Sequence, residues 1–68
     1  MAMNILMLKG KMVERGFNVE RLAASMYIDR SSLYRKLNSC EKFTIGDVQK
    51  IKEILKLSDE EARAIFFG

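Results

Sequence analysis

Basic and hydroxyl side chains are concentrated in one short segment, residues 29–38, which opens with the sequence Asp-Arg-Ser-Ser. Leu33 and Leu37 are four residues apart, so they share one face of a helix. The segment is interpreted as carrying the basic side chains Arg30, Arg35 and Lys36 away from that face. Such a helix can rest on a core by its apolar side. Its polar side can then offer arginine donors to the O6 and N7 acceptors of guanine in the major groove of DNA. The chemistry that this pattern favours is recognition of base edges.

The residues that precede this segment predict the other helix of a helix-turn-helix. Asn18 is a good N-cap, and its side chain can accept a hydrogen bond from an amide two or three residues later. The inner face of this helix is expected to consist of Leu22, Ala23 and Met26. The turn takes in Tyr27 and Ile28, with Ile28 pointing inward. Asp29 is expected to cap the helix that follows.

Helical periodicity extends nearly from end to end, and strand-like alternation lasts no more than a few residues. A first helix is expected to begin near the N-cap Asn4 and to end at Gly16, with Phe17 returning to the core. Its apolar stripe should contain Ile5, Leu8 and Met12, with Leu6 and Val13 alongside. Two further helices are predicted after capping boxes at Thr44–Asp47 and Ser58–Glu61. Their apolar sides should contain Ile45, Val48, Ile51, Ile54 and Leu55, and then Ala62, Ile65 and Phe66. Phe43, before the fourth helix, is expected to tuck against the core.

Five short helices predict one compact all-α domain over residues 1–68.

Composition excludes several classes of function. The 68 residues contain no His, no Pro and a single Cys, so neither a disulfide framework nor a structural metal site is expected. We expect no enzymatic activity, cofactor or small-molecule ligand, because the chain has no Gly-rich phosphate loop and no nucleophile beside an evident base. Cys40 is interpreted as an inert thiol, and Asp59-Glu60-Glu61 as a favourable helix N-terminus. The sequence shows no membrane span and no signal-peptide pattern, which predicts a cytoplasmic protein.

Charge is divided unevenly along the chain. Residues 1–42 contain eight Lys and Arg against four Asp and Glu, a net charge of +4, whereas residues 43–68 contain four against five, a net charge of −1. A basic half that faces an anionic polymer and a nearly neutral half that serves the core would produce this division. A small protein with a basic overall composition could show the same division of charge without binding an anionic polymer.

Four features of the sequence carry a family resemblance: Leu22-Ala23, Ile28 five positions after Ala23, Leu33 ten positions after it, and the opening Arg30-Ser31-Ser32-Leu33. Over about Leu8 to Ser58 the chain resembles the lambda-repressor-like helix-turn-helix family. This is the class of Cro and repressor DNA-binding domains and of xenobiotic-response-element-type regulators. The segments around Phe43-Thr44-Ile45 and Ile65-Phe66-Phe67 are similar to small regulators from phages and mobile elements of Gram-positive bacteria.

Two departures from the family pattern affect the expected contacts. The family often has Gln where this chain has Val19, and that Gln orients a phosphate contact and a neighbouring recognition residue. After the recognition helix the family often has Glu-Asn-Gly, whereas this chain has Leu37-Asn38-Ser39. The anchoring Leu therefore falls one position later, and Lys36 is expected to face outward.

The resemblance implies a set of contacts to double-stranded DNA. The residues expected to contact bases are Arg30, Ser31, Tyr34 and Arg35. The residues expected to contact phosphates are Asn18, Arg21, Ser32, Lys36, Asn38 and Lys42. For the two serines, capping of their own helix is an alternative role. For Tyr34 the alternative is to cover the edge of the core.

The expected activity is transcriptional regulation by occupation of an operator. One small domain buries a modest surface, so a homodimer on a palindromic site is expected, formed in solution or only on DNA. The dimer contact is predicted at Ile65, Phe66 and Phe67, which could instead close the core of the monomer. The alternative functions are a protein-interaction module, such as an antirepressor or adaptor, and an antitoxin. RNA binding is less favoured, because the chain lacks exposed aromatic platforms.

Overall fold

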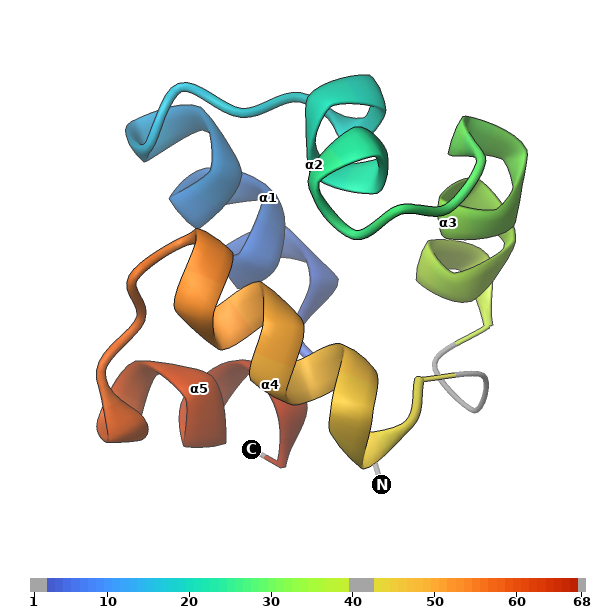
Figure 1. Ribbon diagram of the computed structural model, residues 1–68. Helices are drawn as coiled ribbons and strands as arrows, with labels where there is room; N and C mark the ends of the chain where they lie inside the picture. Colours follow the sequence, from blue (N-terminus) through green and yellow to red (C-terminus); the bar gives the residue numbers. More distant parts are fainter. Residues whose placement is uncertain (1–2, 40–42, 68) are drawn as a thin grey trace.

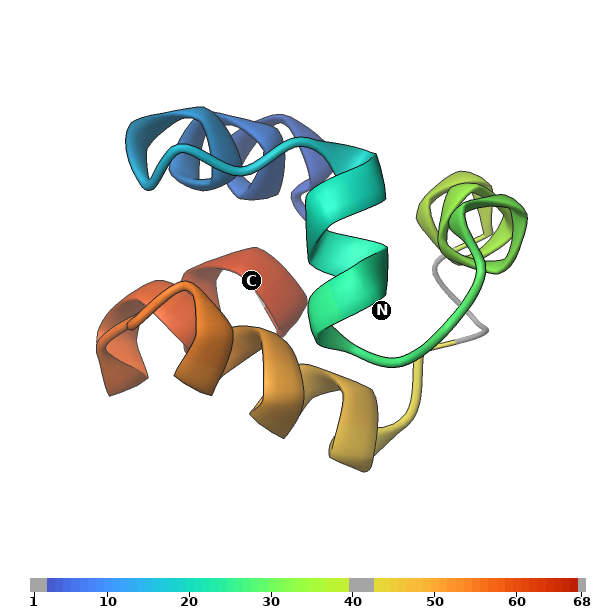
Figure 2. The ribbon, with the colours of Figure 1, turned by 45° about the horizontal axis from the view of Figure 1, so that its top comes forward.

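The computed structural model describes residues 3–39 and 43–67, which form a compact bundle of α-helices (Figure 1). The helices are α1 (Ile5–Glu14), α2 (Val19–Ser25), α3 (Arg30–Asn38), α4 (Ile45–Ile54) and α5 (Asp59–Phe66). The prediction of an all-α fold with five helices is confirmed for this part of the chain. In the two ribbon views α3 lies at one edge of the molecule, beside α2 and separated by α2 from α1 (Figures 1 and 2).

The predicted N-terminal caps are present, with one exception. The side chains of Asn4 and Asn18 accept hydrogen bonds from backbone amides three residues later, at 3.0 Å and 2.7 Å. Both predicted capping boxes are formed, at the starts of α4 and α5. Asp29 has the extended backbone of an N-cap, but within the described part of the chain its side chain makes no capping hydrogen bond. Asp29 therefore holds the predicted N-cap position of α3, but without a capping hydrogen bond from its side chain.

A residue with positive φ follows each of α1, α2 and α4. These residues are Gly16 (77°), Tyr27 (60°) and Lys56 (53°), and no other described residue has positive φ. Each forms the two hydrogen bonds of a Schellman motif. At the end of α2, the amide of Tyr27 donates to the Ala24 carbonyl at 3.1 Å and that of Ile28 donates to the Ala23 carbonyl at 3.0 Å. The residue after each positive-φ position is apolar and packs with the core: Phe17, Ile28 and Leu57. The chain thus turns back toward the core after α1, α2 and α4.

All five helices contribute to one core. Its buried members are Leu8, Met12, Leu22, Ala23, Met26, Leu33, Leu37, Ile51, Leu55, Leu57, Ala62, Ile65 and Phe66. Phe43 is partly buried against this core, as expected, and its ring centroid lies 6.0 Å from that of Phe66. The amide of Asn4 donates to the Ile65 carbonyl at 2.7 Å, which joins the start of α1 to α5. Among the described residues, no polar or charged residue is buried.

Three apolar side chains that were predicted on or beside the apolar sides of their helices are exposed: Leu6, Val13 and Ile45. Leu6 and Val13 are seven residues apart, so they share the face of α1 that is turned away from the buried Leu8 and Met12. Ile45 is the first residue of α4 and extends beyond the packed part of that helix. The helices of residues 3–39 and 43–67 are too short and too polar to cross a membrane.

Candidate nucleic-acid interface

The helix α3 is held against the rest of the molecule by its two leucines. Leu33 is fully buried and Leu37 nearly so, as predicted. The Lys36 ammonium forms an ion pair with Asp47 of α4 at 2.9 Å, which adds a polar contact near the C-terminal end of α3. Partial burial would raise the pKa of Asp47, but the hydrogen bonds from Lys36 and Thr44 outweigh it and leave that pKa below its ordinary value. The helix is therefore fixed along one side.

The other side of α3 is exposed and carries three of the four side chains that were predicted to contact bases. Ser31, Tyr34 and Arg35 project from the side of the helix that is turned away from the buried leucines. Arg30 occupies the first helical position, beside α2, and its side chain is 62% exposed. The Arg35 guanidinium donates to the Ser32 hydroxyl at 3.4 Å, so this serine interacts within its own helix. The structure brings all four predicted base-contacting residues onto the surface of one helix.

The residues predicted to contact phosphates are more dispersed. Asn18 and Arg21 lie together at the start of α2, where Arg21 donates to the Gly16 carbonyl at 3.1 Å and stacks 5.0 Å from the centroid of the Phe17 ring. Asn38 is exposed at the end of α3, whereas Ser32 is half-buried. Lys36 is half-buried and forms its ion pair with Asp47 of α4, so the expectation that it faces outward is wrong. Lys42, like Cys40, lies outside the described residues.

Two exposed residues beside this surface were not predicted to take part in it. Tyr27, in the turn between α2 and α3, is 93% exposed. Glu20, in the first turn of α2, has a carboxylate oxygen 3.4 Å from a guanidinium nitrogen of Arg30. Glu20 and Arg30 lie in the first turns of their helices, but the sequence alone does not determine how those helices lie against each other, so it carried no signal for this contact.

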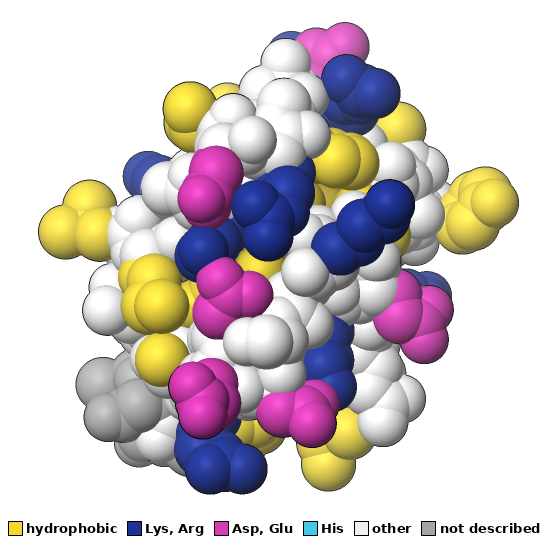
Figure 3. All heavy atoms as spheres, turned by 90° about the vertical axis from the view of Figure 1, so that its left-hand side faces the viewer, with side chains coloured by type: hydrophobic (Ala, Val, Ile, Leu, Met, Phe, Trp, Pro, Cys, Tyr) yellow, Lys and Arg dark blue, Asp and Glu magenta, His cyan; other side chains and the backbone are white. Residues whose placement is uncertain are grey.

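The face of the molecule away from α3 carries charges of both signs. Figure 3 shows acidic and basic side chains interleaved there, rather than a continuous basic surface. Several of the charged residues of α1, α4 and α5 are paired: Lys11 with Glu14 and Glu61, Arg15 with Glu14, and Lys52 with Asp59. These contacts neutralise charge locally, so this part of the surface presents less unpaired positive charge to an anionic polymer.

The three residues of the predicted dimer contact differ in exposure. Ile65 and Phe66 are buried in the core of the single chain, so they take the alternative role of closing that core. Phe67 is 51% exposed. It lines a groove between α4 and α5 together with Ile45, Val48 and Ala62, and with charged side chains that include Arg63. The exposed apolar surface at this end is therefore built from both helices.

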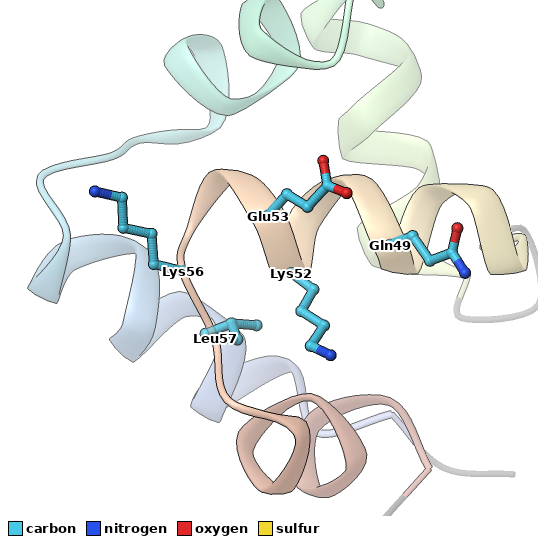
Figure 4. A pocket seen from close by; sticks show the side chains of 5 residues that line it. All are labelled: Gln49, Lys52, Glu53, Lys56 and Leu57. Atoms are coloured by element: carbon cyan, nitrogen blue, oxygen red, sulfur yellow. The ribbon is translucent and has the colours of Figure 1, made fainter.

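The described surface offers little to a metal ion or a small molecule. Residues 3–39 and 43–67 contain no group of three Cys, His, Asp or Glu side chains placed to hold a metal. A second hollow, on α4, is lined by Gln49, Lys52, Glu53, Lys56 and Leu57. Figure 4 shows that Lys52 points toward α5 while Glu53 and Lys56 point in other directions, so these polar groups do not converge on one point.

No protein-family model, curated protein or solved structure matches this chain. Function is therefore inferred from the placement of side chains on α2 and α3.

Proposed function

We propose that this protein is a sequence-specific DNA-binding regulator of transcription that places α3 in the major groove of operator DNA. One observation carries the proposal: α3 is fixed by Leu33 and Leu37 while Arg30 and its polar neighbours face solvent. A helix that is anchored along one side and polar along the other fits the major groove, where each base pair presents a distinct set of donors and acceptors. The protein would act in the cytoplasm as a Cro-like or repressor-like protein of phage or mobile-element type.

Contacts to phosphates would orient the domain on the duplex. Arg21 and Asn18 lie at the start of α2, and Asn38 lies at the far end of α3, so they bracket the base-reading side chains. Lys42 is a further candidate from the sequence. Such contacts contribute affinity for every DNA sequence, and they make binding weaker as salt concentration rises.

A second copy of the chain is the proposed partner on DNA. Phe67 is half-exposed beside the apolar side chains of Ile45, Val48 and Ala62, which supports an isologous contact in which each copy presents the same groove and the same ring. Two copies related in this way would read a palindromic operator.

A second candidate function is a protein-interaction module, such as an antirepressor, an adaptor or an antitoxin. The observation that favours it is the exposed apolar face of α1, formed by Leu6 and Val13. Exposed apolar side chains that share one face are more typical of a protein contact than of a DNA contact.

Selection of bound fragments from a random library of double-stranded DNA tests the proposed function. We expect an enriched, symmetric motif. Fluorescence anisotropy on that motif should then separate the roles of Arg30 and Lys42. Arg30→Ala should lower the affinity for the motif about 5-fold or more and change the affinity for random DNA little. Lys42→Ala should weaken binding to all sequences alike and reduce the salt slope by about one. Lys50→Ala, on the exposed side of α4, is the control and should leave the motif affinity unchanged. Failure to enrich any motif at low salt would favour the protein-interaction module.

A further inference from the structure

The contact between Glu20 and Arg30 places a carboxylate inside the proposed DNA interface. The two groups are 3.4 Å apart, and their side chains are 73% and 62% exposed. An ion pair this exposed to water contributes little to folding stability. Its place between the first turns of α2 and α3, however, puts a negative charge next to the arginine that is best situated to reach a base.

A carboxylate in this position has a defined effect on DNA binding. It repels phosphates, so it lowers the affinity for every sequence by a similar factor. In the major groove a carboxylate can offset this lower affinity by accepting a hydrogen bond from the amino group of a base. The N4 amino group of cytosine is the preferred donor to Glu or Asp. Arginine prefers the O6 and N7 acceptors of guanine. An Arg and a Glu held side by side therefore match a guanine next to a cytosine.

We infer that Glu20 is a specificity-determining residue, which holds the Arg30 guanidinium beside α2 and accepts a hydrogen bond from the amino group of a cytosine that neighbours the guanine read by Arg30. This inference rests on the proposed function. Other charged groups near this point are engaged elsewhere: Arg21 with the Gly16 carbonyl and Arg35 with Ser32. Asp29 is the other exposed acid at the start of α3 and is the competing candidate for the same role.

The test compares three variants that each remove one negative charge. Glu20→Gln replaces the proposed cytosine-binding carboxylate with an amide, which pairs best with adenine, and Asp29→Asn makes the same change in the competing acid. Glu60→Gln removes the charge of an exposed acid in the first turn of α5, on a helix that lies away from α3 in Figures 1 and 2. Each variant and the wild-type protein undergo the same selection from a random DNA library, followed by anisotropy on the wild-type motif and on random DNA.

We expect Glu20→Gln to bind random DNA more tightly than wild type but to lose the preference for cytosine at one position of each half-site. The ratio of motif to random affinity should fall at least about 5-fold. Glu60→Gln should leave this ratio and the motif unchanged. Thermal unfolding should be nearly the same for wild type and Glu20→Gln, because the side chain is exposed.

Three results would overturn the inference. If Glu20→Gln changes motif and random affinities by the same factor, Glu20 acts only through general charge. If Asp29→Asn abolishes the cytosine preference while Glu20→Gln retains it, the role belongs to Asp29. If the wild-type protein enriches no motif, both the inference and the proposed function fail. In the first two results the wild-type protein still enriches a motif, so only the inference fails.

Discussion

Replacement of Tyr27 by glycine should stabilise the protein, although tyrosine is the larger and more apolar residue. Tyr27 has φ of 60° at the end of α2, and a side chain in this left-handed region costs about 1–2 kcal/mol. Glycine avoids that cost but loses more backbone freedom on folding, which offsets about 0.5–1 kcal/mol. The Tyr27 ring is 93% exposed, so its removal sacrifices little packing. The net gain is about 0.5–1 kcal/mol, or a rise in Tm of about 2–8 °C for a domain of this size.

The assay is chemical and thermal unfolding followed by circular dichroism. Tyr27→Ala serves as the control, since it removes the ring but keeps a side chain in the left-handed region, and its stability should stay near that of wild type. Lys56→Gly tests the same reasoning at the end of α4, where φ is 53°, and should also stabilise. Destabilisation by both Tyr27→Gly and Tyr27→Ala would refute the reasoning, because it would mean that the exposed ring itself stabilises the fold.

Three further predictions concern stability. Gly10→Ala should stabilise α1 by about 0.5–1 kcal/mol in denaturant unfolding, because among the described residues no atom beyond the adjacent residues and the local helix backbone lies within 4 Å of the added methyl group; a decrease in stability would contradict this. Leu33→Ala should cost about 2–5 kcal/mol and leave much of the protein unfolded at 25 °C, whereas Tyr34→Ala on the exposed side of α3 should lose little helical circular dichroism; equal losses would refute the anchoring role of Leu33. Hydrogen bonds from Lys11, and then from the Ser58 backbone, lower the pKa of Glu61 from 4.5 to about 2. The stability that Glu61 adds should therefore be complete above about pH 4.5 and lost as pH falls toward 2, so unfolding curves of Glu61→Gln and wild type should converge over that range and stay apart above it.

Local signals in the sequence were sufficient to predict most of the helix boundaries. An Asn or a capping box stands at four of the helix starts, and Gly16 stands at one helix end. The ends of α2 and α4 carried no such signal, because Tyr27 and Lys56 are residues that rarely adopt positive φ. There the apolar residue that follows has to pack against the core, and this tertiary requirement overrides the local preference.

The apolar pattern was less informative at the edges of the core. Leu6 and Val13 are as hydrophobic as the residues that pack, and only the arrangement of the other helices decides which face of α1 is covered. The same limit applies to the site. The exposure of Ser31, Tyr34 and Arg35 followed from the positions of Leu33 and Leu37. The exposure of Arg30 and its contact with Glu20 depend on how α2 and α3 lie against each other.

Methylation interference on the selected duplex tests the docking of α3 most directly. Dimethyl sulfate methylates guanine at N7, in the major groove, and adenine at N3, in the minor groove. If α3 lies in the major groove with Arg30 on a guanine, N7 methylation of one guanine in each half-site should block binding of the wild-type protein, and Arg30→Ala should be insensitive to that methylation. Interference from adenine N3 alone, or equal sensitivity of the wild-type and Arg30→Ala proteins at every guanine, would contradict the proposed docking.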